Sequence, residues 1–140
     1  MKKFVVLHIV PHLNGGLGRV LLSTLKFSKN KSANFTHEFI VTDEKNLTPA
    51  SLKLFSEYYD CLHIGKKNDF IKEKMDKADI VQIEWWNHPL IYNFLTSFTF
   101  PPSRMILCSH VNGLSRPNIV TKNVVEFSDI FLAATKATKK

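Results

Sequence analysis

Cysteine is scarce in this sequence: only two occur among 140 residues, and neither belongs to a metal-binding or redox motif. Cys61 and Cys108 lie within apolar segments and have no CxxC partner, which excludes a zinc ribbon and a thioredoxin-like redox centre. We therefore expect two buried free thiols, the usual state of cysteine in a cytosolic protein.

Long hydrophobic runs are missing as well. No apolar stretch reaches the roughly 18 residues of a membrane-spanning helix, which excludes an ordinary transmembrane segment. The N-terminal MKKFVVLHIVPH joins two lysines to a short apolar run, but no small-residue cleavage site precedes Pro11. A buried first strand therefore explains this run better than a signal peptide. Repeats and low-complexity tracts are also absent, so we expect one globular domain over residues 1–140.

Acidic residues are outnumbered: 12 Asp and Glu face 19 Lys and Arg, which gives a formal net charge of +7. The lysines are scattered, with short pairs such as Lys66-Lys67 rather than one basic block. This pattern favours anionic partners, such as phosphate groups or an acidic lipid surface. No basic strand is interleaved with aromatic residues, and no recognition helix is evident, so nucleic acid is not an expected partner.

Segments rich in β-branched residues alternate with longer amphipathic segments along the chain. The expected strands are Phe4–Val10, Phe35–Thr42, Cys61–Ile64, Asp79–Trp85, Arg104–Ser109 and Ile130–Ala134. The expected helices are Gly18–Ser28, Pro49–Tyr58 (capped by Thr48), Asp69–Lys77, Pro89–Ser97 and Ile119–Phe127. This alternation predicts an α/β fold, a doubly wound and mostly parallel sheet with helices on both faces. Ligands bind such sheets beyond the carboxyl ends of the strands.

Three of the five glycines fall in one loop, within HIVPHLNGGLGRVLL after the first strand. Two interpretations account for Gly15, Gly16 and Gly18. They form either a bare tight turn, or an anion site in which a phosphate binds the unpaired N–H groups at the start of a helix. Arg19 could add a forked cationic contact or face solvent, and His12 lies just before the loop.

The same loop matches the dinucleotide fingerprint only in part. Gly16-Leu17-Gly18 supplies G-x-G, but Leu21 stands where the third glycine is expected. Asp43, at the end of the second strand, lies close to where a ribose-binding acid would sit. The Walker pattern and a Tyr-x-x-x-Lys pair are missing. A nicotinamide dinucleotide-binding domain therefore stays an alternative.

The fourth strand ends in EWWNHP. Strand alternation places Trp85 and Trp86 on opposite sides, so one packs in the core and the other either packs too or stacks on a sugar ring. Glu84 could bind hydroxyls or pair with a lysine. Asn87 and His88 could bind ligand or only cap the helix that starts at Pro89.

The fifth strand ends at His110, followed by a Val-Asn-Gly turn. His110 is either hydrogen-bonded at the strand terminus or in contact with ligand. Asn112 could bind a sugar hydroxyl, Gly113 would allow close approach, and Arg116 binds an anion or decorates the surface. No short ligand spacing supports a metal site made of Glu84, His88 and His110, so no metal is expected. His8, His37 and His63 fall inside strands and are expected to be neutral packing residues.

Taken together, VLHIVPHLNGGLGRVLL, ADIVQIEWWNHPLIYNFL and RMILCSHVNGLSRP, followed by SDIFLAATKAT, resemble the N-terminal domain of the group 1 (GT4-like) family of retaining GT-B glycosyltransferases. The resemblance covers essentially all 140 residues. It implies two Rossmann-like domains with the active site between them, the N-terminal one binding acceptor and the C-terminal one holding the nucleotide-sugar through an E-x7-E element. That second half is absent after residue 140, so we expect a truncated domain, inactive alone.

The resemblance also implies roles for the loop residues. Donor phosphate would be held by Gly15, Gly16, Leu17 and Gly18, and Arg19 is expected beside them from its charge. For His110 the resemblance implies contact with the transferred sugar or acceptor hydroxyl, and we expect it to be the catalytic residue. From their side chains and positions, the residues expected to hold acceptor or sugar are His12, Glu84, Trp86, Asn87, His88, Asn112, Gly113 and Arg116. No cofactor or metal is implied beyond the nucleotide-sugar, which is a co-substrate.

The expected partners are a nucleotide-sugar and a glycan or lipid-linked acceptor, as in polysaccharide biosynthesis. The expected location is cytoplasmic, and the basic surface would suit peripheral contact with the inner face of the membrane. A non-catalytic fragment is the third alternative, beside the transferase and the dinucleotide-binding domain.

Overall fold

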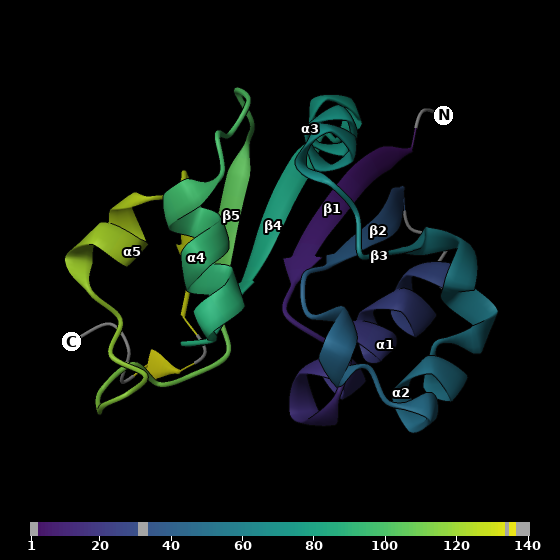
Figure 1. Ribbon diagram of the computed structural model, residues 1–140, viewed down its shortest axis with the longest axis horizontal. Helices are drawn as coiled ribbons and strands as arrows, with labels where there is room; N and C mark the ends of the chain where they lie inside the picture. Colours follow the sequence, from purple (N-terminus) through teal and green to yellow (C-terminus); the bar gives the residue numbers. More distant parts are fainter. Residues whose placement is uncertain (1–2, 31–33, 134, 137–140) are drawn as a thin grey trace.

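The computed structural model describes residues 3–30, 34–133 and 135–136, arranged as one sheet with helices packed around it (Figure 1). The strands are β1 (Phe4–Val10), β2 (Phe35–Val41), β3 (Leu62–Ile64), β4 (Ile80–Trp85), β5 (Met105–Ser109) and β6 (Ile130–Leu132). The α-helices are α1 (Gly15–Asn30), α2 (Pro49–Leu54), α3 (Asn68–Lys77), α4 (Pro89–Ser97) and α5 (Lys122–Glu126). Two 3-10 segments, η1 (Glu44–Asn46) and η2 (Ser56–Cys61), flank α2.

The six strands lie in the order β3-β2-β1-β4-β5-β6, and all neighbouring pairs are parallel. This is the strand order of a Rossmann-like, doubly wound sheet. The chain builds outward from β1 to β3 and then returns to the other side of β1 with β4. The order therefore reverses between β1 and β4, beside which such sheets bind ligands. The predicted fold class is confirmed.

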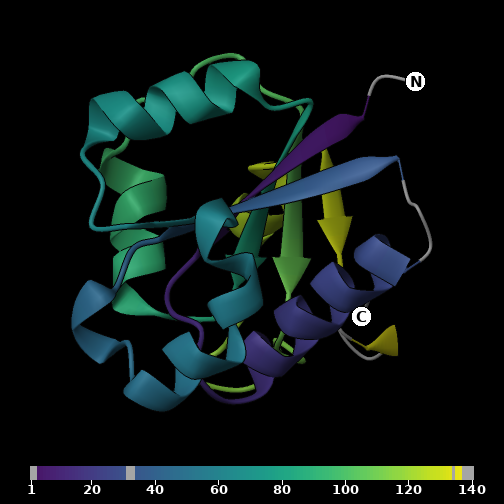
Figure 2. The same cartoon turned by 90° about the vertical axis from the view of Figure 1, so that its right-hand side faces the viewer.

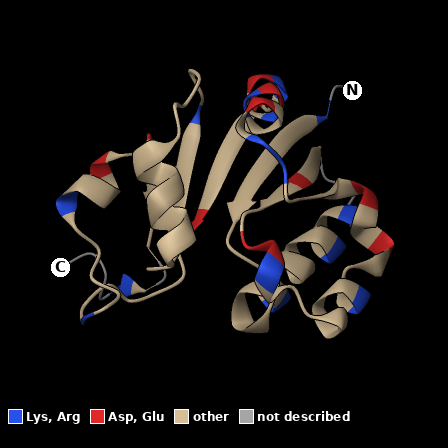
Figure 3. Cartoon of the chain, in the orientation of Figure 1, with Lys and Arg blue, Asp and Glu red and all other residues tan. Residues whose placement is uncertain are grey.

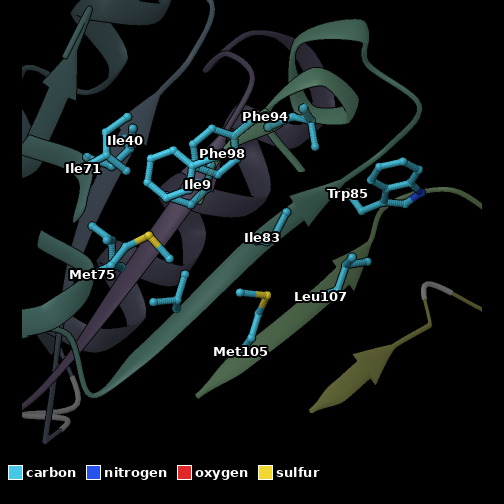
Figure 4. Packing of buried hydrophobic residues seen from close by; sticks show 13 residues of the cluster. Ile9, Ile40, Ile71, Met75, Ile83, Trp85, Phe94, Phe98, Met105 and Leu107 are labelled. Carbon is cyan, nitrogen blue, oxygen red and sulfur yellow. The ribbon is translucent and has the colours of Figure 1, made fainter. Parts of the chain in front are cut away.

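Apolar side chains fill both faces of the sheet, which explains why β1 is apolar along most of its length. One face packs against α3 and α4 through a cluster that includes Ile9, Ile83, Met75, Phe94 and Phe98, together with Trp85 (Figure 4). The other face packs against α1 and against Phe55, the residue that joins α2 to η2, through Val10, Phe39, Leu21 and Leu25. Figure 2 shows α1 and α4 on opposite sides of the sheet.

The start of α2 follows from local sequence. The Thr48 hydroxyl accepts a hydrogen bond from the Ser51 N–H at 3.1 Å, and the Ser51 hydroxyl accepts one from the Thr48 N–H. This reciprocal capping box starts α2, with Pro49 in its first turn. The predicted cap at Thr48 is confirmed.

Several predicted boundaries are wrong. Helix α1 begins three residues earlier than predicted, because the Gly18 N–H donates to the Asn14 carbonyl at 3.3 Å and so closes a first turn through the glycines. The helix predicted over Pro49–Tyr58 ends at Leu54 and gives way to η2, which has a kink at Tyr58. The helix predicted over Ile119–Phe127 shortens to α5. Strand β6 ends at Leu132, and the predicted end at Ala134 lies outside the described residues.

The predicted burial of the two thiols is also wrong, because Cys61 and Cys108 are free but partly exposed. Each lies near the end of a strand or turn rather than in its apolar centre. Lys and Arg are spread over α1, α2, α3 and α5 rather than gathered on one element (Figure 3). Among the helices that the structure describes, none combines the length and the apolar character needed to cross a membrane.

Candidate functional site

A cavity of about 300 Å³ lies at the carboxyl ends of the central strands, beside the reversal of strand order. We call it the strand-end pocket; it is lined by His12, Gly15, Gly16, Leu17, Trp86 and His110. Asn14 and Val111, which were not predicted, complete its wall. The pocket thus brings together residues from the loops after β1, β4 and β5, three segments that are far apart in the sequence.

The three glycines of the loop differ in backbone conformation and in surroundings. Gly15 has a φ of +62°, a left-handed conformation that disfavours any side chain. Gly18 is buried, and a Cβ there would overlap the Leu13 carbonyl, so this glycine lets α1 pack on the preceding loop. Gly16 has no neighbour within 4 Å of a Cβ position and lies at the pocket. Gly16 is therefore the glycine that neither the backbone nor the packing requires.

The first turn of α1 leaves amide hydrogens unused. The first helical hydrogen bond of α1 comes from Gly18, so the N–H groups of Gly15, Gly16 and Leu17 precede it. Within the described residues these three N–H groups have no hydrogen-bond partner. They carry the positive end of the helix dipole at the wall of the strand-end pocket, an arrangement suited to an anion.

His110 supplies a cationic group to the same pocket. Its Nε2 lies 2.6 Å from the Glu84 carboxylate, and its side chain is 19% exposed. Burial lowers the pKa of His110, but the contacts with Cys108 and Glu84 outweigh it and raise the pKa from 6.5 to about 9. His110 is therefore an imidazolium at neutral pH, which suits an electrostatic contact to an anion better than the removal of a proton.

Glu84 does not line the pocket; it lies behind His110 and is fully buried. One carboxylate oxygen accepts from His110, and the other accepts from His8 at 2.7 Å and from Gln82 at 2.8 Å. Burial would raise the pKa of Glu84, but the hydrogen bonds from His110 and His8 outweigh this effect and lower it. Glu84 is thus a buried carboxylate without a free oxygen for a sugar hydroxyl.

His8 continues this network across the sheet. Its Nε2 lies 2.9 Å from His37 Nδ1 on β2, and His37 Nε2 lies 2.8 Å from the Ser28 hydroxyl on α1. Burial, followed by the effect of His8, lowers the pKa of His37 to about 4, so His37 is neutral. The prediction that His8 and His37 are packing residues is wrong, because both are hydrogen-bonded. Sequence reasoning missed the network, although polar residues at His8 and Glu84 within otherwise apolar strands were its signal.

The aromatic residues divide as the strand alternation predicts. Trp85 is 2% exposed and packs in the core, whereas Trp86 is partly exposed and lines the pocket. The Trp86 ring lies 5.4 Å from the His12 ring and 5.1 Å from the His88 ring. Burial and the nearby His88 lower the pKa of His12, so the His12 ring that lines the pocket is uncharged at neutral pH.

His88 and Asn87, both predicted to contact ligand, make hydrogen bonds within the protein instead. His88 is the N-cap of α4: its Nδ1 accepts from the Leu90 N–H at 3.3 Å. The Asn87 side chain donates to the Pro117 carbonyl and so ties the end of β4 to the loop after β5. Arg19 is exposed and lines a different hollow, on the outer side of α1.

The rest of the loop after β5 lies outside the pocket wall. The Asn112 side chain accepts from the Leu114 N–H at 3.1 Å, which forms a local turn. Gly113 has a φ of +72°, and a Cβ there would come within 2.7 Å of the Val120 side chain. Its close approach is therefore to Val120. Arg116 is exposed.

One cluster of potential metal ligands occurs among the described residues: Glu84, Cys108 and His110 offer atoms within 4.8 Å of one another. It includes Cys108 in place of the His88 considered from the sequence. Cys108 and His110 share one face of the chain at the end of β5 because they are two residues apart, a signal that the sequence carried. His110 and Glu84 are already joined by a direct hydrogen bond, so an ion would have to displace it.

Asp43, the acid of the dinucleotide alternative, is 5% exposed. Its carboxylate accepts from the Asn46 side chain at 2.5 Å and lies 3.5 Å from His88 Nε2. Both contacts are made by the same carboxylate oxygen, Oδ2, and they compete with a ribose for this acid.

A second cavity, of about 650 Å³, lies at the other end of the sheet and is lined by His37, Ser28, Phe35 and Tyr58 among others. Charged residues of its wall pair within the protein, as Lys74 does with Glu38 at 2.6 Å and Lys29 with Glu57 at 4.0 Å. We therefore place the candidate site at the smaller strand-end pocket, where parallel sheets bind ligands.

The chain matches no family model, and the search of curated proteins finds no significant relative.

Proposed function

We propose that this chain is the acceptor-side domain of a retaining glycosyltransferase, which transfers a sugar from a nucleotide-sugar to a glycan or glycolipid acceptor. One observation carries the proposal: unpartnered amides, an imidazolium and an indole ring line one pocket at the reversal of strand order, within the part of the chain that the structure describes. The Rossmann-like sheet and the resemblance of the three loop segments to group 1 enzymes support it.

In this proposal, one group of pocket residues contacts the donor phosphates and another contacts a sugar ring. The amides of Gly15, Gly16 and Leu17, with the His110 cation, would face the diphosphate of the donor. When the bond between sugar and diphosphate breaks, negative charge grows on the leaving phosphate oxygen, and fixed donors stabilise that charge. The apolar faces of Trp86 and His12 would pack against a sugar ring. A second domain that holds the nucleoside would complete the active site.

The test is a titration that reads the loop amides directly. Inorganic pyrophosphate, UDP, GDP and NADH are each added to the chain, and backbone amide shifts are followed by NMR. We expect pyrophosphate and the nucleoside diphosphates to shift the amides of Gly15, Gly16 and Leu17. The amide of Gly65, another exposed glycine with a φ of +62°, is the internal control.

Two variants distinguish the loss of the Gly16 N–H group from the mere replacement of glycine by a larger residue. Gly16→Pro removes one N–H in the first turn of a helix, where proline is tolerated, whereas Gly16→Ala keeps it. Pyrophosphate affinity should fall several-fold in Gly16→Pro and change little in Gly16→Ala. Selective binding of NADH, or no binding of any of these ligands at millimolar concentration, would overturn the proposal in favour of a dinucleotide-binding domain or a non-catalytic fragment.

A further inference from the structure

The side chains of Ser28, His37, His8, Glu84 and His110 form a continuous set of hydrogen bonds, which we call the buried polar chain. It runs from α1 through β2, β1 and β4 to the end of β5. Each link is between 2.6 and 2.9 Å. At one end His110 lines the strand-end pocket, and at the other His37 and Ser28 line the 650 Å³ cavity.

When His8 and His37 are neutral, one arrangement of protons satisfies every link. The Ser28 hydroxyl donates to His37 Nε2, His37 Nδ1 donates to His8 Nε2, and His8 Nδ1 donates to Glu84. His110 Nε2 donates to the second Glu84 oxygen from the opposite side. Every donor therefore points toward one carboxylate, and bonds aligned in this way polarise one another.

We propose that Glu84 is a positioning residue for His110, and that His8, His37 and Ser28 form the support that keeps this carboxylate ionised and fixed in place. A buried carboxylate with fewer donors would take up a proton and release its hold on the imidazole. Gln82 adds a neutral donor to the same oxygen as His8. The role of His110 toward a diphosphate rests on the proposed function, but the action of Glu84 on His110 does not.

The titratable groups around His110 come from three segments. Glu84 approaches from β4, Cys108 from the strand that leads to His110, and His12 from the loop after β1 on the far wall of the pocket. His12 has a lowered pKa and carries no charge at neutral pH, so the groups that raise the pKa of His110 are Cys108 and Glu84. Removal of the Glu84 charge should therefore lower the pKa of His110, while the contact with Cys108 remains.

The experiment is an NMR titration of the histidine rings between pH 5 and 10, with His110 assigned from the spectrum of His110→Gln. In the unaltered chain we expect the His110 midpoint at about 9. In Glu84→Gln, which keeps shape but not charge, the midpoint should fall by about 1 to 3 on the pH scale. Glu38→Gln is the matched control, because Glu38 accepts from His63 and Lys74 in a separate cluster; it should leave His110 unchanged.

The unaltered chain alone can overturn the proposal, whether or not Glu84→Gln folds: a His110 midpoint at the ordinary 6.5 contradicts it. An unchanged midpoint in a folded Glu84→Gln contradicts it equally. The outcome is separable from that of the proposed function. If Glu84→Gln moves the His110 midpoint while pyrophosphate leaves the loop amides unmoved, the positioning role of Glu84 is supported and only the transferase proposal fails.

Discussion

His110 and Glu84 come from adjacent strand ends with their side chains 2.6 Å apart, the imidazole at a pocket and the carboxylate sealed beneath it. Because Glu84 is fully buried, its charge acts through His110 rather than on solvent or ligand. The pocket therefore contains the His110 imidazolium, whereas the Glu84 carboxylate that balances its charge is out of reach of a ligand.

Stability should be greatest near pH 6.5, where the effects of His110 and His37 are both present. The raised pKa of His110, about 9 against 6.5, means that folding favours the protonated ring; this stabilisation is complete below pH 6.5 and is lost as pH rises through 9. The lowered pKa of His37, about 4, means that folding favours the neutral ring; this stabilisation is complete above pH 6.5 and is lost as pH falls through 4. A tenfold change in proton affinity on folding corresponds to about 1.4 kcal/mol, so the alkaline loss should be on the order of 2 to 3 kcal/mol.

Urea unfolding between pH 4 and 9 measures both limbs of this profile. His110→Gln should flatten the limb above pH 6.5 and leave the acid limb in place, because only the contribution of His110 is removed. A variant that keeps its full alkaline loss would show that another group causes it.

The three loop glycines should respond differently to alanine. Gly18→Ala should cost roughly 2 to 3 kcal/mol, because its methyl group would overlap the Leu13 carbonyl. Gly15→Ala should cost about 1 kcal/mol for its left-handed φ. Gly16→Ala should be neutral or stabilise by up to about 1 kcal/mol, since nothing surrounds it and alanine favours helix. Thermal unfolding of the three variants checks the ranking, and equal losses would contradict it.

Replacement of Trp85 should affect mainly the stability of the fold, whereas replacement of Trp86 should affect mainly ligand binding. Trp85→Ala should cost about 3 to 5 kcal/mol because the ring is in the core. Trp86→Ala should cost less and should weaken the binding of sugar-bearing ligands, because its ring lines the pocket. Urea unfolding and ligand titration of both variants test this. The same loss of stability in both would mean that Trp86 is a packing residue only.

Cys61 should react slowly with thiol reagents although it is partly exposed. Burial raises the pKa of its thiol to about 11, and the thiol donates to the Tyr58 carbonyl at 2.9 Å. At pH 8 the reactive thiolate should be about 100-fold scarcer than for a free cysteine. The Cys108→Ser variant isolates Cys61, and its rate of reaction with an aromatic disulfide is compared in the folded state and in urea. Equal rates in the two states would exclude the effect.

The fold could be predicted because its signals are local and repeated. The apolar run at Phe4–Val10 and the cap at Thr48 each specify their element without help from distant residues. The convergence of the glycine loop, Trp86 and His110 followed from the general rule for parallel sheets. The role of Glu84 could not be predicted, because it depends on the pairing of β4 with β1 and β5, which no local pattern contains. The packing role of Gly18 could not be predicted for the same reason, because only the folded structure brings it against the Leu13 carbonyl.

The buried polar chain also has a consequence for how the strands align. Its members His8, His37 and Glu84 belong to three neighbouring strands, β1, β2 and β4. A slip of β1 by two residues would keep each apolar side chain on its own face of the sheet, so hydrophobic burial alone selects weakly between the two alignments. The slip would, however, carry His8 away from its partners His37 and Glu84 and leave the buried Glu84 carboxylate with one donor fewer. The hydrogen bonds that His8 makes across the sheet therefore favour the observed alignment of β1 with its neighbours over this alternative.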